Sequence, residues 1–158
     1  MKQKHNIDPV YDKNSRILIL GSFPSVKSRE SMFFYHHPQN RFWKVLAYLH
    51  NQPIPLTIDD KKTFLLQNNI AVWDVIESCD ITNSSDSTIK NVKPNDISKL
   101  LKNSHIQRIF ANGNKAFTLY NKHIKDSVGI ECTLLPSTSP ANASYSLEKL
   151  CEEWQIIK

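Results

Sequence analysis

The sequence predicts a three-layer α/β/α domain built on a four-stranded, mainly parallel sheet. Four short apolar runs alternate along the chain with segments whose apolar residues recur at helical spacing. The runs are continuously apolar rather than alternating, which is typical of parallel strands buried on both faces. Strands that alternate with helices form a parallel sheet with helices packed on each side. The predicted fold class is therefore α/β.

The expected elements follow from these patterns and from local capping signals. The strands are expected at residues 16–20, 70–73, 107–111 and 130–135. Helices are expected at residues 41–49 and, behind a capping box, at residues 57–67. Three more are expected: one that begins at Pro94, one that begins after a cap at Asn112, and a last one that includes residues 147–154. The last of these has the clearest helical period, with apolar residues at i, i+3, i+4 and i+7. Residues 78–93 are rich in Ser, Asn, Asp and Thr, and we expect a long surface loop there.

Length and composition indicate one domain. The 158 residues are 40% apolar and 22% charged, enough for a core that needs no disulfide or metal. We expect a single domain over residues 1–158, with residues 1–10 as a flexible arm. The amino-terminal residues lack the apolar core of a signal peptide, and no segment is long enough to span a bilayer. We also expect a monomer.

The cysteines argue against a metal centre. Cys79, Cys132 and Cys151 are odd in number, far apart and not arranged as CxxC, so the sequence supports neither a zinc site nor an iron–sulfur cluster. His36 and His37 are adjacent, so in an extended loop they point in opposite directions. We therefore expect no metal and no cofactor, and a reducing cytoplasm as the location.

The charge balance is compatible with a polyanionic partner. The formal net charge is +5 and the isoelectric point is near 9.1. Lys27, Arg29 and Lys115 lie close to loops at strand ends, where they are expected to contact phosphates. The alternative is an ordinary solvated basic surface.

The loop after the first strand has the composition of a base-binding pocket. Residues 21–24 read GSFP, and residues 33–41 add three aromatic rings, two histidines and an Asn-Arg pair. Backbone that approaches a ligand closely, aromatic faces and neutral polar groups suit an extruded nucleobase. The alternative is an ordinary loop whose aromatic residues pack in the core.

A second unusual loop, LPSTSPANA, spans residues 135–143. Its prolines favour a rigid backbone, and its hydroxyls and Asn142 suit phosphate oxygens or a base edge. The alternative is that Asn142 or Ser144 caps the last helix. Both loops leave the carboxyl ends of parallel strands, where α/β folds bind their ligands, so we expect them to face one crevice.

Together these segments resemble the uracil-DNA glycosylase superfamily. HPQNRFWKV at residues 37–45 resembles a segment of the mismatch-specific uracil-DNA glycosylases, and GSFP and LPSTSPANA occupy the places of the superfamily's first and second motifs. The combination of GSFPSVKSRE, HPQNRFW, AVWDV, SDSTI and LPSTSPANA is most similar to the hypoxanthine (deoxyinosine) DNA glycosylase branch. The resemblance extends over residues 9–154.

The resemblance implies a monofunctional DNA glycosylase that removes hypoxanthine, and also xanthine, from damaged DNA in base excision repair. The third position of the first motif is Phe23 rather than Asn or Asp, so the resemblance assigns the attacking water to Asn40. Ala141 stands where relatives carry a bulky wedge. The implied roles are catalytic for Asn40 and Ser137, base-binding for Gly21, Ser22, Phe23, Pro24, Tyr35, His37 and Asp74, and DNA-binding for Ser25, Lys27, Arg29, Lys115, Ser139 and Asn142.

Several alternatives stay open at this stage. Tyr35 either stacks on the extruded base or packs with Phe33 and Phe34 in the core. Asp74 either accepts a hydrogen bond from N1–H of hypoxanthine or caps the next segment. An alternative substrate is uracil or mismatched thymine. Two alternatives of another class are a non-catalytic nucleic-acid-binding relative and a small nucleoside or nucleotide hydrolase.

Overall fold

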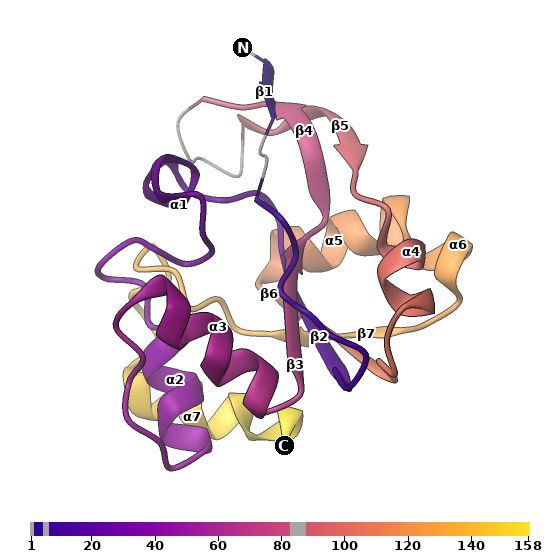
Figure 1. Cartoon of the computed structure of the whole chain (residues 1–158). Coiled ribbons are helices and arrows are strands. Elements are labelled where there is room, and N and C mark those ends of the chain that lie inside the picture. Colours follow the sequence, from indigo (N-terminus) through magenta and orange to yellow (C-terminus); the bar gives the residue numbers. More distant parts are fainter. Residues whose placement is uncertain (1, 5–6, 83–87) are drawn as a thin grey trace.

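The computed structural model describes residues 2–4, 7–82 and 88–158, and it confirms the predicted parallel sheet (Figure 1). The sheet has four strands in the order β3-β2-β6-β7, and each neighbouring pair is parallel. Its strands are β2 (Ile17–Gly21), β3 (Ile70–Asp74), β6 (Arg108–Asn112) and β7 (Cys132–Leu135). All four carboxyl ends therefore meet at one edge of the sheet.

Helices α1, α3, α4 and α7 each begin behind a capping side chain. The Thr57 hydroxyl accepts from the Asp60 amide, Asp96 accepts from Lys99, and Ser146 accepts from Lys149. The helices are α1 (Val26–Ser31), α2 (Phe42–Leu49), α3 (Ile58–Gln67), α4 (Ile97–Lys102), α5 (Asn114–His123), α6 (Lys125–Val128) and α7 (Leu147–Trp154), followed by a 3-10 helix (Gln155–Ile157).

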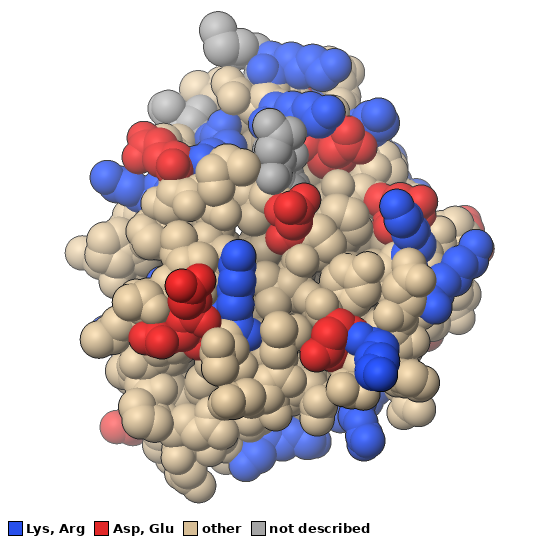
Figure 2. Space-filling view, viewed as in Figure 1, with Lys and Arg blue, Asp and Glu red and all other residues tan. Residues whose placement is uncertain are grey.

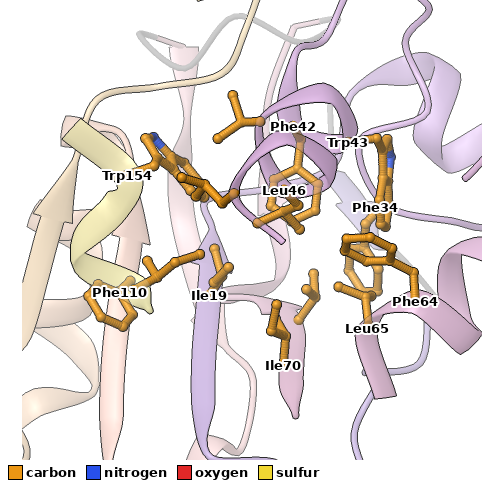
Figure 3. Close-up of a cluster of buried hydrophobic side chains, with 14 of the residues drawn as sticks. Ile19, Phe34, Phe42, Trp43, Leu46, Phe64, Leu65, Ile70, Phe110 and Trp154 are labelled. Atoms are coloured by element: carbon orange, nitrogen blue, oxygen red, sulfur yellow. The ribbon is translucent and has the colours of Figure 1, made fainter. Parts of the chain in front are cut away.

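Two cores lie on opposite faces of the sheet, because successive strand residues point to opposite sides. Ile17 and Ile19 of β2 face a core built with α2, α3 and α7, whereas Leu18 and Leu20 face a core built with α4 and α5. Figure 3 shows the first core, in which Phe42 and Trp154 lie above Ile19. The predicted three-layer arrangement is therefore confirmed.

The chain also forms a three-stranded antiparallel sheet that the sequence did not predict. It has the order β1-β4-β5, with β1 (Lys2–Lys4), β4 (Ile76–Asp80) and β5 (Lys90–Pro94). Residues 1–10 were expected to form a flexible arm. In the structure β1 instead pairs with β4, and the side chains of Ile7 and Val10 are buried. The expected loop over residues 78–93 is wrong for the two strands: β4 is mostly buried, whereas β5 is mostly exposed and polar. Residues 83–87 lie outside the described residues.

Two further differences concern helix ends. Helix α1 lies inside the segment expected to be a loop, since Ser25 caps it and Met32 ends it in the left-handed conformation with φ of 57°. Helix α7 is capped by Ser146, so neither Asn142 nor Ser144 has the capping role that the sequence left open.

Among the residues that the structure describes, no helix has the length and apolar character needed to cross a membrane.

Candidate active site

A cavity of about 140 Å³ opens at the carboxyl edge of the parallel sheet. The expectation that the two unusual loops face one crevice is confirmed, since both contribute to its walls. The described residues that line it are Gly21, Ser22, Phe23, Pro24, Ser25, Ser28, Phe34, Tyr35, Asn40, Asp74, Asn112, Ser137, Thr138 and Ser139.

Glycine at position 21 lets two polar groups converge at the cavity. A Cβ atom on Gly21 would lie 2.5 Å from Asp74 Oδ1 and 3.1 Å from the Tyr35 hydroxyl. The Val75 amide donates to the Gly21 carbonyl over 2.8 Å and fixes the backbone there. A side chain at this position would therefore displace Asp74 or Tyr35, and only glycine leaves room for both.

Asp74 ends β3 at the cavity and is 3% exposed. Its backbone carbonyl accepts from Asn95 Nδ2 over 2.9 Å, which ties the strand end to the residue before the Asp96 cap of α4. The side chain of Asp74 points toward Gly21, so this carboxylate contributes to the cavity wall.

Phe23 contributes an aromatic ring to the cavity and is 8% exposed. The guanidinium of Arg29 lies 5.2 Å from the centre of that ring, a cation–π distance. Arg29, which was expected to contact phosphate, thus lies against the Phe23 ring. Lys27 is exposed on the same helix, and Ser25 caps it.

Both the backbone and the ring of Tyr35 are fixed by their surroundings. Its φ of 50° is unusual for a bulky residue, and Trp43 Nε1 donates to its carbonyl over 3.2 Å. Its ring stacks on Phe42 with the centroids 3.9 Å apart and the planes at 19°. Its packing partner is thus Phe42, whereas Phe33 stacks on Trp43.

The Tyr35 hydroxyl is the polar group at the end of this rigid ring. It is buried and makes no hydrogen bond of normal geometry within the described residues. Burial, and then the negative charge of Asp74, raise the pKa of Tyr35, while the polar side chain of Asn112, near the hydroxyl but outside normal hydrogen-bond geometry, lowers it. The hydroxyl is therefore protonated at neutral pH and is able to donate.

Asn40 faces the cavity at the start of α2. Its Oδ1 accepts from the Phe42 amide over 3.0 Å, and its own amide donates to the His37 carbonyl over 2.9 Å. A carbonyl oxygen has two lone pairs, so Oδ1 retains one for a water. His37 does not line the cavity; its Nδ1 accepts from the Gln39 amide over 3.1 Å and shapes the turn.

Arg41 is a site residue that the sequence reasoning missed. Its guanidinium donates to the carbonyls of Ser139 and Asn142, each over 3.0 Å, and to that of Tyr145. Its amide donates to the Thr138 carbonyl over 3.1 Å. Arg41 therefore connects the start of α2 to the second loop, and its place beside Asn40 in HPQNRFW was the available signal.

Asn112 also belongs to the site and not, as expected, to a helix cap. Its Nδ2 donates to Thr138 Oγ1 over 3.0 Å, and its Oδ1 accepts from the Thr138 amide over 3.1 Å. Gly113 directly precedes α5 instead, with φ of 97°. A Cβ atom added at Gly113 would lie 3.2 Å from the Cβ of Ser137. The position of Asn112 at a strand end was the signal for its role.

The second loop is braced by its own side chains. Ser137 Oγ accepts from the Ser139 amide over 3.1 Å, and Asn142 Nδ2 donates to the Ser137 carbonyl over 3.0 Å. Asn142 and Ala141 line an adjoining hollow of about 510 Å³. Lys115 lies in the first turn of α5, outside the cavity lining.

The described part of the chain contains no group of three or more His, Cys, Asp or Glu side chains arranged to hold a metal ion. The cavity instead offers three aromatic rings, a carboxylate, amide groups and hydroxyls. Such groups are able to bind a planar heterocycle, orient a water and stabilise an anionic leaving group.

Comparisons with known proteins agree with this architecture. The chain is 33% identical over 156 residues to a hypoxanthine DNA glycosylase of Methanosarcina acetivorans, covering 98% of this chain and 97% of that protein. It is 31% identical over 143 residues to a protein of the same name from Methanosarcina barkeri, covering 89% of each.

The fold matches a solved structure as well. The solution NMR structure of a candidate uracil DNA glycosylase from Methanosarcina acetivorans superimposes with a TM-score of 0.84 and 32% identity, over 99% of this chain and 96% of that one. A model of the uracil DNA glycosylase superfamily matches residues 9–157. This chain is therefore a member of the uracil DNA glycosylase superfamily.

Proposed function

We propose that the protein is a monofunctional DNA glycosylase that releases hypoxanthine, and also xanthine, from damaged DNA. The observation that carries the proposal is Asn40, which faces the cavity with an amide oxygen that can hold a water, while Phe23 fills the usual catalytic position. The names and near full-length similarity of the Methanosarcina relatives support hypoxanthine as the base.

In this mechanism the damaged nucleotide leaves the duplex and its base enters the cavity. The Phe23 ring contacts the base, and Asn40 Oδ1 accepts from a water beneath C1′. The glycosidic bond breaks through an oxocarbenium-like state, and the water then adds to C1′. Ser137 and the second-loop amides stabilise the departing base and the neighbouring phosphate.

The arrangement of lysines supports release of the base without strand cleavage. A bifunctional glycosylase needs an amine of lowered pKa to form a Schiff base. Lys61 has a pKa lowered by burial, but its ammonium lies 5.2 Å from the centre of the Trp43 ring, and no lysine is among the described residues that line the cavity. We expect no covalent protein–DNA adduct on borohydride treatment.

The partner in this proposal is damaged DNA, contacted by Lys27 and Lys115 and by Ser139 and Asn142 of the second loop. We propose that the protein acts as a monomer in the cytoplasm. Its three cysteines are buried and unpaired, which suits a reducing compartment.

The test is a base-release assay with oligonucleotides that contain deoxyinosine, deoxyxanthosine, uracil or a mismatched thymine. The assay contains excess EDTA, because the proposed chemistry uses no metal. We expect free hypoxanthine at the highest rate and an intact abasic strand. Faster release of uracil or thymine would assign the enzyme to a pyrimidine substrate, and activity on the free nucleoside alone would assign it to nucleoside hydrolysis.

A further inference from the structure

The Tyr35 hydroxyl is a buried donor for which the proposed mechanism has no use. A ring that only stacks on a base needs no hydroxyl, and phenylalanine would serve. The hydroxyl is nevertheless buried at the cavity without a normal hydrogen bond among the described residues. Leaving a buried polar group unsatisfied is unfavourable, so such a group in a binding cavity indicates a ligand that satisfies it.

Three features aim this hydroxyl. The stack on Phe42 fixes the ring plane, and Phe42 packs edge-on against Trp43 and Trp154. The Trp43 indole holds the Tyr35 carbonyl. The backbone is in the left-handed region, which surrounding contacts must maintain.

One face of the Tyr35 ring is therefore occupied by a core residue. The polar edge of the ring, where the hydroxyl stands, is the part that meets Gly21 and Asp74. This geometry favours a hydrogen-bonding role for Tyr35 over the stacking role that the family resemblance implies.

Donor and acceptor stand side by side at this point. The hydroxyl donates, and the Asp74 carboxylate, which has several lone pairs, accepts. Hypoxanthine presents the matching pattern, a keto oxygen at C6 next to an N1–H. Adenine presents the reverse, an amino group next to an unprotonated nitrogen, so the same pair of side chains disfavours the undamaged base.

We propose that Tyr35 determines specificity by donating its hydroxyl proton to the keto oxygen of the extruded base, while Asp74 accepts from the neighbouring N–H. This inference rests on the proposed glycosylase function. It deepens that function by naming the chemical edge that is read: a keto group beside an N–H, as deamination produces. Tyr35 acts on binding and orientation of the base, and Asn40 acts on the water.

The test compares Tyr35→Phe with the wild type on two substrates in single turnover. One oligonucleotide carries deoxyinosine and the other carries unsubstituted purine, which has neither the keto oxygen nor the N1–H. We expect Tyr35→Phe to slow hypoxanthine release about a hundredfold and to leave purine release within about twofold of the wild type. Tyr35→Leu, which also removes the ring, should slow release from both substrates.

Thermal melting distinguishes this role from a structural one. Since Tyr35→Phe removes an unsatisfied buried hydroxyl, its melting temperature should equal or exceed that of the wild type. A Tyr35→Phe variant that releases hypoxanthine at the wild-type rate, that slows both substrates equally, or that melts at a lower temperature would overturn the inference. Wild-type protein that releases no hypoxanthine would instead overturn the proposed function, and the inference with it.

Discussion

At the scale of single residues, the cavity depends on the missing side chain of Gly21. Asp74 Oδ1 and the Tyr35 hydroxyl occupy the space that a Cβ would need, at 2.5 and 3.1 Å. Gly21→Ala should therefore displace the carboxylate, lower base release at least about tenfold, and destabilise the fold by about 1–3 kcal/mol. Single-turnover base release and chemical unfolding measure the two effects.

Gly129→Ala is the matched control for that substitution. Gly129 has φ of 72°, so alanine is strained there, but no atom lies within 4 Å of the added Cβ. We expect a stability loss of about 1–2 kcal/mol with unchanged base release. Equal losses of activity in both variants would mean that Gly21 matters for stability and not for the cavity.

At the scale of elements, Arg41 joins the two loops on which the site is built. Lysine keeps the charge but lacks the planar fork that reaches the carbonyls of Ser139, Asn142 and Tyr145. Arg41→Lys should loosen residues 137–145, raise their amide hydrogen exchange and lower kcat/KM about tenfold or more. Arg108→Lys is the control, because Arg108 also donates to a carbonyl, that of Ile156, outside the site. A rigid loop in Arg41→Lys would contradict this role.

The central elements were predictable from the sequence because periodicity and capping act locally. The four strands of the parallel sheet and the Thr57 cap followed from such signals. The β1-β4-β5 sheet did not, because its polar strands β1 and β5 resemble loop sequence and β1 pairs with a strand more than 70 residues away. In the same way, Asn40 stood in a motif, whereas the roles of Arg41 and Asn112 depend on partners about 100 and 26 residues away.

At the scale of the whole molecule, charge should govern DNA affinity. Figure 2 shows acidic and basic side chains interspersed on one face, with several basic ones at the end formed by β1, β4 and β5. Contacts to about four to six phosphates would give a log–log salt slope of roughly that size. Lys27→Gln or Lys115→Gln should reduce the slope by about one, whereas Lys102→Gln on α4 should leave it unchanged. Fluorescence anisotropy measures this, and a flat response would contradict extensive phosphate contact.

Asn40 positions the attacking water in the proposed mechanism, and single-turnover release of hypoxanthine by Asn40→Ala is the decisive measurement. Asn40 also accepts from the Phe42 amide, so alanine should cost about 1 kcal/mol of stability. Loss of water positioning should slow base release about a hundredfold or more with DNA binding almost unchanged, and Asn40→Asp should retain part of the rate. Near wild-type release by Asn40→Ala, in protein that still binds DNA, would mean that another group positions the water.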